Sequence, residues 1–310
     1  MLKPATFLRA VAERPSFALL PLLEAGAFNA LDDRTYLPFA YRVLTGERLD
    51  IEHPRTFNDK IAWLKLHDRK PVYQELADKY RARAVVADVL GEAWNVPLLG
   101  VWDDPAQIDF GALPDSFVLK CTHGYGAVQV CTDKASFDTD RACRVLARTL
   151  RTDFYGRARE WVYKDAEPRI IAEPYLGANG ERPVDYKFMC MNGRVTFVCL
   201  SRSVSAAHDT PGGLSFFLPD GTPAPFGRAD YPPLQGGWRQ PASYLRMYDA
   251  AERLSRAIEA PFVRIDLYDA GSASLFSECT FYPCGGTMFL DPPEYNEVLG
   301  RMLELPGGVA

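Results

Sequence analysis

The segment FVLKCTHGYGAVQVC, residues 117–131, decides the fold expected for this chain. A run of strand-forming residues ends next to Lys120, a short turn with two glycines follows, and a second apolar run completes the segment. This order predicts a β-hairpin. Side chains alternate along a strand, so Lys120 shares a face with Val118 and has a partly buried stem. Its ammonium group therefore requires an anion.

The turn of this hairpin, THGYGA, contains Gly124 and Gly126. Glycines let the backbone approach a ligand closely and point its amides inward. A lysine beside such a turn suits a lid over a polyphosphate. The alternative is an ordinary hairpin in which the Lys120 ammonium reaches the solvent.

Composition indicates a globular protein with two or three lobes. The chain has 310 residues, of which 47% are hydrophobic and 24% charged, enough for a large core. The formal net charge of -5 gives no electrostatic reason to expect nucleic-acid binding.

The N-terminal apolar stretch, residues 17–28, is too short to span a bilayer and is interrupted by Pro21 and Glu24. It also lacks the pattern of a signal peptide. The seven cysteines have no CxxC spacing and mostly lie in apolar runs. We therefore expect core cysteines in a reducing compartment, and a cytoplasmic protein without a transmembrane segment.

The order of the expected elements defines an α+β class. Capping signals and apolar periodicity predict helices at residues 56–67, 76–91, 138–150 and 244–258. Apolar runs predict strands at residues 96–102 and 169–176, and hairpins at residues 185–202, which turn at Asn192-Gly193, and 261–283. The proline- and glycine-rich residues 210–241 are expected to form a loop.

The last hairpin carries a pair of acids. Arg264 and Asp266 share one strand face, as do Glu278, Thr280 and Tyr282 on the returning strand.

A turn centred near Ser272 would place Asp266 directly opposite Glu278. Neighbouring carboxylates repel each other unless a cation lies between them. Magnesium would satisfy them, because it binds one or two carboxylates together with nucleotide phosphates. Arg264 would then stabilise charge on a phosphoryl group or an oxyanion. The alternative is a surface ion pair between Arg264 and a neighbouring carboxylate.

A further acid, Glu173, lies in the apolar run IIAEPYL. It is either exposed at the strand end or accepts hydrogen bonds from specific donors, such as an adenine amino group. Tyr175 and Leu176 would supply backbone contacts and an apolar wall, whereas Pro174 has no N–H to offer.

Taken together, these segments resemble the TupA-like branch of the ATP-grasp superfamily, which is associated with teichuronopeptide and surface-polysaccharide biosynthesis. The resemblance runs from about Tyr36 to Leu299, and FNDKIAWLKL and FVLKCTHG are its most specific segments. It implies an ATP-grasp fold: two α+β lobes that hold ATP, with a short helical N-terminal region. The three expected parts are the helical N-terminal region (residues 1–75), a central lobe with the glycine-bearing loop (76–176) and a C-terminal lobe with a metal site (177–310).

The resemblance also implies which residues bind ATP. Lys79 and Lys120 would hold the phosphates, and the loop from His123 to Gly126, with Gly124 inside it, would close over them. Glu173 would bind the adenine edge, with Tyr175 and Leu176 at the hinge. Asp185 or Lys187 would occupy the place of the ribose-binding acid.

In the catalytic centre, the resemblance implies that Arg264 and Lys120 are catalytic and that Asp266 and Glu278 bind Mg²⁺. Thr280 replaces an asparagine that many relatives have as a further metal ligand, and threonine is common in this branch.

The implied activity is an ATP-dependent carboxylate–amine ligase that forms an amide through an acyl phosphate. Its partners would be ATP, a small-molecule or glycan carboxylate, and an amine such as an amino acid. Two alternatives remain: a phosphotransferase on the same fold, and a glycosyltransferase that uses a nucleotide sugar.

Overall fold

The computed structural model describes residues 10–12, 14–177, 184–202, 213–234, 238, 240–271 and 273–308. The chain divides into two compact units. Unit 1 comprises Met1–Arg69, Asp153–Lys164 and Tyr282–Ala310, and unit 2 comprises Lys70–Thr152 and Asp165–Phe281. The three-part division expected from the sequence stays a prediction. Across the described residues, no helix is both long enough and apolar enough to cross a membrane.

Unit 1 is mainly helical. Its elements are α2 (Leu20–Glu24), α3 (Asp33–Thr45), α4 (Phe57–His67), α8 (Phe154–Ala158), β11 (Leu290–Asp291) and α10 (Tyr295–Met302). The predicted capping box starts α4: Thr56 accepts from the backbone N–H of Asp59, whose side chain accepts from the N–H of Thr56. Asn58 then ties this helix to the C-terminal segment, because its Nδ2 donates to the Met288 carbonyl at 3.1 Å.

Unit 2 contains two antiparallel sheets and four helices among its described residues. The helices are α5 (Pro71–Ala77), α6 (Ala82–Leu90), α7 (Thr139–Leu150) and α9 (Tyr244–Ile258). The strands are β1 (Gly100–Trp102), β2 (Phe117–Cys121), β3 (Gln129–Cys131), β4 (Ile170–Pro174), β5 (Val184–Met191), β6 (Arg194–Arg202), β7 (Gly213–Phe217), β8 (Gly227–Arg228), β9 (Phe262–Asp269) and β10 (Ser274–Thr280).

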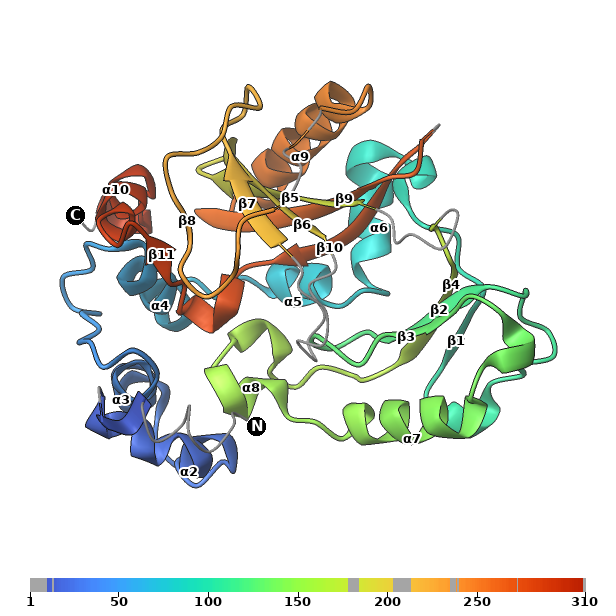
Figure 1. The fold of residues 1–310 in the computed structure, drawn as a ribbon, viewed down its shortest axis with the longest axis horizontal. Coiled ribbons are helices and arrows are strands. Elements are labelled where there is room, and N and C mark those ends of the chain that lie inside the picture. Colours follow the sequence, from blue (N-terminus) through green and yellow to red (C-terminus); the bar gives the residue numbers. More distant parts are fainter. Residues whose placement is uncertain are drawn as a thin grey trace. The chain divides into compact units, whose positions relative to one another are not determined.

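The four-stranded sheet has the order β1-β4-β2-β3 and includes the predicted hairpin of β2 and β3. Helix α7 covers one face of this sheet (Figure 1). Leu146 of α7 packs there with Phe117 and Leu119 of β2. Because side chains alternate along β2, Lys120 projects from the opposite face.

The five-stranded sheet has the order β10-β9-β5-β6-β7. Helix α9 covers one face (Figure 1), where the side chains of Ile265, Leu267 and Phe188 are fully buried. The other face carries the charged residues of β5, β9 and β10. This difference between the faces follows from the alternation of apolar and charged residues along each strand.

The Asn192-Gly193 turn joins β5 and β6 as predicted. Both residues have positive φ, 52° and 79°, as a two-residue type I′ turn requires. The helices predicted at 138–150 and 244–258 and the strand predicted at 169–176 are confirmed as α7, α9 and β4.

The continuous helix predicted at residues 76–91 is wrong. Helix α5 ends at Ala77 and α6 begins at Ala82. Asp78 breaks the helix, because its Oδ1 accepts from the backbone N–H groups of Tyr80 (2.8 Å) and Arg81 (2.9 Å). The predicted stop at Gly91 is confirmed.

Two other predictions need correction. The strand expected at residues 96–102 is shortened to β1, since Pro97 has no N–H for a ladder. Within the loop expected at residues 210–241, β7 pairs with β6 as an edge strand. Residues 210–212, 235–237 and 239 of this stretch lie outside the described part of the chain.

Candidate active site

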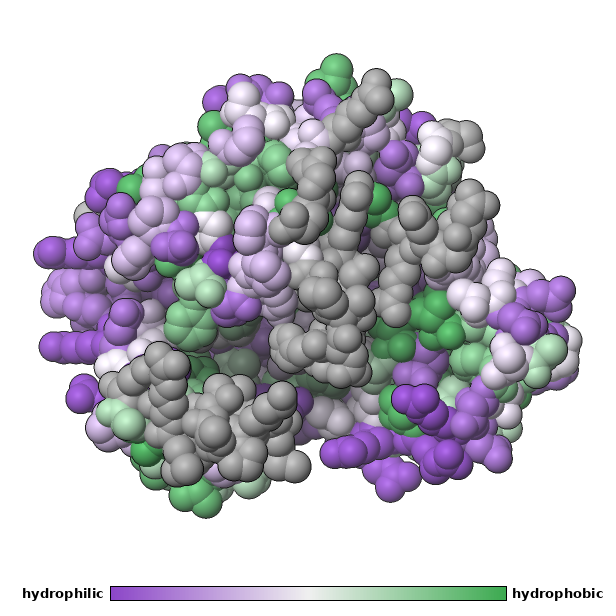
Figure 2. Space-filling model, in the orientation of Figure 1, coloured by the Kyte–Doolittle hydropathy of each residue, from purple (hydrophilic) through white to green (hydrophobic). Residues whose placement is uncertain are grey.

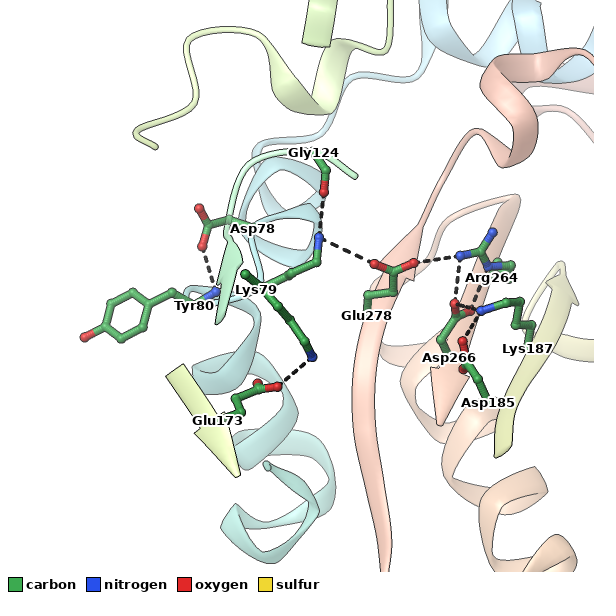
Figure 3. Close-up of polar contacts among 11 residues, drawn as sticks. Asp78, Lys79, Tyr80, Gly124, Glu173, Asp185, Lys187, Arg264, Asp266 and Glu278 are labelled. Atoms are coloured by element: carbon green, nitrogen blue, oxygen red, sulfur yellow. Dashed lines mark hydrogen bonds and ion pairs between the residues drawn. The ribbon is translucent and has the colours of Figure 1, made fainter. Parts of the chain in front are cut away.

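The charged face of the five-stranded sheet is centred on Arg264 (Figure 3). Its Nε donates to Asp266 Oδ1 at 2.7 Å, and its Nη2 donates to Asp266 Oδ2 at 2.7 Å and to Glu278 Oε1 at 2.8 Å. The guanidinium of Arg264, which binds Asp266 through two hydrogen bonds, therefore lies between the two acids. A cation was expected at this position because neighbouring carboxylates repel each other. Within the described part of the chain, Arg264 Nη1 makes no hydrogen bond.

The predicted pairing of Asp266 with Glu278 is confirmed, with an added detail. Leu267 pairs with Phe276, whereas Asp266 pairs with Glu278, so Ser277 is an extra residue in β10. This β-bulge places Glu278 opposite Asp266. Ser272, the expected centre of the turn, lies outside the described residues.

Burial and the neighbouring cations together give the two acids different pKa values. Asp266 has 0% exposure, and this burial raises its pKa to about 6 despite the nearby Arg264 and Lys187. Burial would also raise the pKa of Glu278, but Lys79 and Arg264 outweigh burial and lower it to about 2. The pKa values of these two neighbouring carboxylates thus differ widely, and such perturbed pKa values are frequent at functional sites.

Lys187 on β5 lies between two carboxylates. Its Nζ donates to Asp266 Oδ2 at 2.7 Å and also to Asp185 Oδ2. Burial would lower the pKa of Lys187, but Asp185 and Asp266 outweigh burial and raise it. Asp185 Oδ1 is buried and has no hydrogen-bond partner among the described residues, so it is available to accept from a ligand hydroxyl.

Lys79 connects the glycine loop to the charged sheet face (Figure 3). Its Nζ donates to the Gly124 carbonyl at 2.6 Å and lies 3.5 Å from Glu278 Oε2. The break between α5 and α6 makes this contact possible, because Asp78 forms a β-bridge with His123. Gly124 and Gly126 have φ of 107° and 78°, a backbone conformation that glycine adopts most readily.

Lys120 and Glu173 form a second pair. Lys120 Nζ donates to Glu173 Oε2 at 2.6 Å, and their side chains are only 12% and 11% exposed. They lie diagonally on neighbouring strands, since Lys120 pairs with Ile171 and Glu173 with Val118. Burial would lower the pKa of Lys120, but Tyr268 and Glu173 raise it overall.

Tyr268 is a site residue that sequence reasoning missed. Lys120 Nζ lies 5.8 Å from the centre of its ring, and the phenol is close enough to influence the titration of Lys120. Its spacing was the available signal, because Tyr268 is two residues beyond Asp266 on the same strand face. By contrast, no sequence pattern indicated that Lys79 would donate to the backbone carbonyl of Gly124.

The predicted site residues thus fall into one network and one pair. The network joins Lys79, Asp185, Lys187, Arg264, Asp266 and Glu278. The pair of Lys120 with Glu173 is linked to it electrostatically, since Lys120 helps to lower the pKa of Glu278. Thr280 lies opposite Arg264 in the ladder, whereas Tyr175 and Leu176 follow the end of β4. The roles of all these residues stay predictions.

The residues present fit a magnesium ion by their chemistry. Asp266, Glu278 and Thr280 offer hard oxygen donors, which Mg²⁺ prefers. A group of three or more His, Cys, Asp or Glu suited to a metal is absent from the described residues. Mg²⁺ commonly binds only one or two protein carboxylates and completes its shell with water and phosphate, so the pair is sufficient.

Two antiparallel sheets with paired acids and lysines are the arrangement that the predicted ATP-grasp class implies. The family model described as TupA-like ATPgrasp matches residues 59–304. The chain belongs to this family. Its membership confirms the predicted family and the predicted ATP-grasp α+β fold, and it agrees with the predicted enzyme class, an ATP-grasp ligase.

Solved structures give more distant similarities. The ATP-grasp ligase PsnB complexed with minimal precursor has 12% identity over 75% of this chain and 61% of its own, with a TM-score of 0.42. D-cycloserine synthetase DcsG has 15% identity over 93% and 95%, with a TM-score of 0.43. The L-amino acid ligase from Bacillus licheniformis has 12% identity over 80% and 55%, with a TM-score of 0.49. This chain thus spans about three fifths of the length of PsnB. No curated protein matches.

Proposed function

We propose that this protein is an ATP-dependent carboxylate–amine ligase that forms an amide through an acyl phosphate. The observation that carries the proposal is the position of Arg264 between Asp266 and Glu278, with Lys79 joining Glu278 to the glycine loop. This arrangement places a cation for a triphosphate, Lys79, beside acids for a metal ion on the charged face of the five-stranded sheet. Family membership supports the same reaction class.

In the proposed reaction, a substrate carboxylate oxygen attacks the γ-phosphorus of ATP and releases ADP. Lys79 and Lys120 bind the triphosphate and offset its charge. Asp266, Glu278 and Thr280 would hold Mg²⁺, which supplies further charge neutralisation at the phosphates when bound. Closure of the glycine loop, residues 123–126, would exclude water from the acyl phosphate.

In the second step, the nitrogen of an amine attacks the acyl carbon, phosphate leaves, and the nitrogen loses a proton. Charge develops on the acyl oxygen in the tetrahedral intermediate. Arg264 is suited to stabilise this oxygen, because its Nη1 keeps donors that are not used by Asp266 or Glu278 within the described residues.

Nucleotide binding completes the proposal. Glu173 would accept from the adenine amino group, with Tyr175 and Leu176 at the hinge. Asp185 would accept a ribose hydroxyl through its unpartnered Oδ1. The substrates would be a small-molecule or glycan carboxylate and an amine in surface-polysaccharide or natural-product biosynthesis. A cytoplasmic location would keep the seven cysteines, all free thiols, reduced.

The experiment combines the protein, ATP, Mg²⁺, a uronic acid and an amino acid, and measures ADP together with the product mass. We expect ADP and an amide, and a loss of about 10²-fold or more in ADP formation for Asp266→Asn and Glu278→Gln. Glu297→Gln is the control, because it removes an exposed carboxylate on α10. Thermal unfolding of each variant separates lost activity from lost fold.

Three outcomes would contradict the proposal. Unchanged ADP formation in both acid variants would remove the metal assignment. A phosphorylated product that persists when the amine is present would favour the phosphotransferase. Thermal stabilisation by nucleotide sugars but not by ATP would favour the glycosyltransferase.

A further inference from the structure

Helix α7 carries a row of arginines on its outer side. The four are Arg141, Arg144, Arg148 and the C-cap residue Arg151, and all are exposed. Their spacing of three, four and three residues places them within an arc of about 80°, since a helix turns about 100° per residue. We call these four residues the arginine row. It spans about 15 Å at 1.5 Å per residue.

The arginine row has no anionic partner within the described part of the chain. Asp140 precedes Arg144 by four residues, yet no ion pair joins them. Three other exposed arginines on helices do pair with the acid four residues before them: Arg253 with Asp249 (3.9 Å), Arg256 with Glu252 (2.9 Å) and Arg301 with Glu297 (3.8 Å). Like charges at helical spacing repel one another. The row thus concentrates unpaired positive charge in a chain whose net charge is -5.

The arginine row is separate from the candidate active site. Ala142, Leu146 and Thr149 on the inner side of α7 are buried, and Leu146 packs on the sheet face opposite to Lys120. Figure 2 shows hydrophilic residues gathered along the outer side of α7, at the lower right of the view. A small ligand bound to the arginine row would therefore not reach the residues proposed to bind ATP. A polymeric ligand bound there would extend beyond the arginine row.

We propose that the arginine row binds a linear polycarboxylate, a polymer with one carboxylate on each unit. Each guanidinium matches a carboxylate in a two-bond geometry, and a line of four cations matches a line of anions. The choice of carboxylate rests on the proposed function, in which a carboxylate is the group activated. The row would hold the polymer while another part of it reacts.

The surface of α7 disfavours other polyanions. None of its apolar residues is exposed, whereas a helix that binds a membrane surface needs an exposed apolar side. The exposed residues of α7 also include no aromatic side chain on which nucleic-acid bases could stack.

Binding of fluorescein-labelled poly-L-glutamate to the full chain, measured by fluorescence anisotropy at low salt and without ATP, tests the proposal. We expect Arg144→Gln/Arg148→Gln to weaken binding about tenfold or more. Binding by this variant should also depend less steeply on salt than binding by the wild type, because fewer cations contact the polymer. The control, Arg256→Gln/Arg301→Gln, removes the same charge from paired arginines and should bind like the wild type.

Equal binding by the two double variants would overturn the proposal, as would no binding by the wild type at low salt. Tighter binding of a single-stranded oligonucleotide or of anionic lipid vesicles would assign the row to those partners instead. ADP formation with a short uronic acid is measured in parallel and should not change in Arg144→Gln/Arg148→Gln. If the proposed ligase activity is wrong, the wild type will form no ADP in this assay. If only the proposed polymer binding is wrong, the wild type will still form ADP.

Discussion

Glu278 lies directly opposite Asp266 on neighbouring antiparallel strands, and the guanidinium of Arg264 bonds to both carboxylates. Two acids at this spacing repel each other in the absence of a cation. Arg264 removes this repulsion in the folded protein before any ligand binds. The same guanidinium therefore stabilises both acids, which the proposed function assigns to a metal–nucleotide complex.

The pH dependence of nucleotide binding provides a first prediction. Asp266 has a pKa raised to about 6, so it becomes neutral, and a poor metal ligand, as the pH falls through 6. We expect the affinity for ADP with Mg²⁺ to decrease from pH 7 to pH 5, as measured by calorimetry. Asp266→Asn is the control, since it retains only the pH dependence of the nucleotide and of other groups. Identical pH dependence in the two proteins would exclude this role.

Stability should depend on pH with opposite signs for the two acids. The folded pKa of Asp266 is raised, so the folded state holds more protons than the unfolded state between about pH 4 and 6, and the contribution of Asp266 falls as pH rises through that window. The folded pKa of Glu278 is lowered to about 2, so its contribution is present above about pH 4.5 and is lost toward pH 2. Urea unfolding of Glu278→Gln should therefore show less loss of stability than the wild type between pH 4.5 and pH 2, and an equal loss would contradict the shift.

Lys120 and Glu173 should depend on each other for stability. Their pair is almost fully buried, so Glu173→Gln leaves a buried ammonium without its carboxylate. We expect a loss of about 3 kcal/mol in the free energy of unfolding. Lys120→Met/Glu173→Leu removes both charges and should be more stable than the sum of the single variants predicts. Additive effects in denaturant unfolding would show that the two residues act independently.

Lys79 should hold the glycine loop in the absence of nucleotide. Lys79→Ala removes the bond to the Gly124 carbonyl, so amide hydrogen exchange at residues 123–126 should become faster in the free protein. Lys70→Ala is the matched control, because exposed Lys70 also donates to one carbonyl, that of Glu259, at 2.8 Å. Unchanged exchange in Lys79→Ala would mean that the loop is held by its other contacts.

A buried lysine in unit 1, Lys65, should stabilise the fold through hydrogen bonds to two backbone carbonyls. Lys65 Nζ donates to the carbonyls of Ala158 and Gly285, each at 2.6 Å, and burial lowers the pKa of Lys65 to about 8. Lys65→Met keeps the stem but leaves two buried acceptors unsatisfied, which should cost about 2 kcal/mol.

Lys134→Met is the comparison for this prediction. Lys134 also donates to two carbonyls, of Gly111 and Leu113, but water can replace it because it is only half-buried. A loss equal to that of Lys65→Met in denaturant unfolding would contradict the role of burial. The lowered pKa of Lys65 also predicts that its own contribution to stability rises between about pH 8 and 10.5, so the difference in unfolding free energy between the wild type and Lys65→Met should shift toward the wild type over that range.

The sequence by itself determined the features that depend on neighbouring residues. Strand alternation placed Arg264 with Asp266 and Lys120 with Val118, Asn192-Gly193 specified a tight hairpin, and Thr56 with Asp59 specified a helix start. These signals are readable because steric and hydrogen-bonding rules act within a few residues of the chain.

Tertiary structure decided the features that depend on residues far apart in the chain. Helical periodicity continued through Asp78, but a bridge to His123 and the capping by Asp78 interrupt the helix there and direct Lys79 to Gly124. The diagonal pairing of Lys120 with Glu173 and the addition of β7 to the sheet arise in the same way. Such contacts form only when the sheets assemble, because the energy of pairing distant segments outweighs local preference.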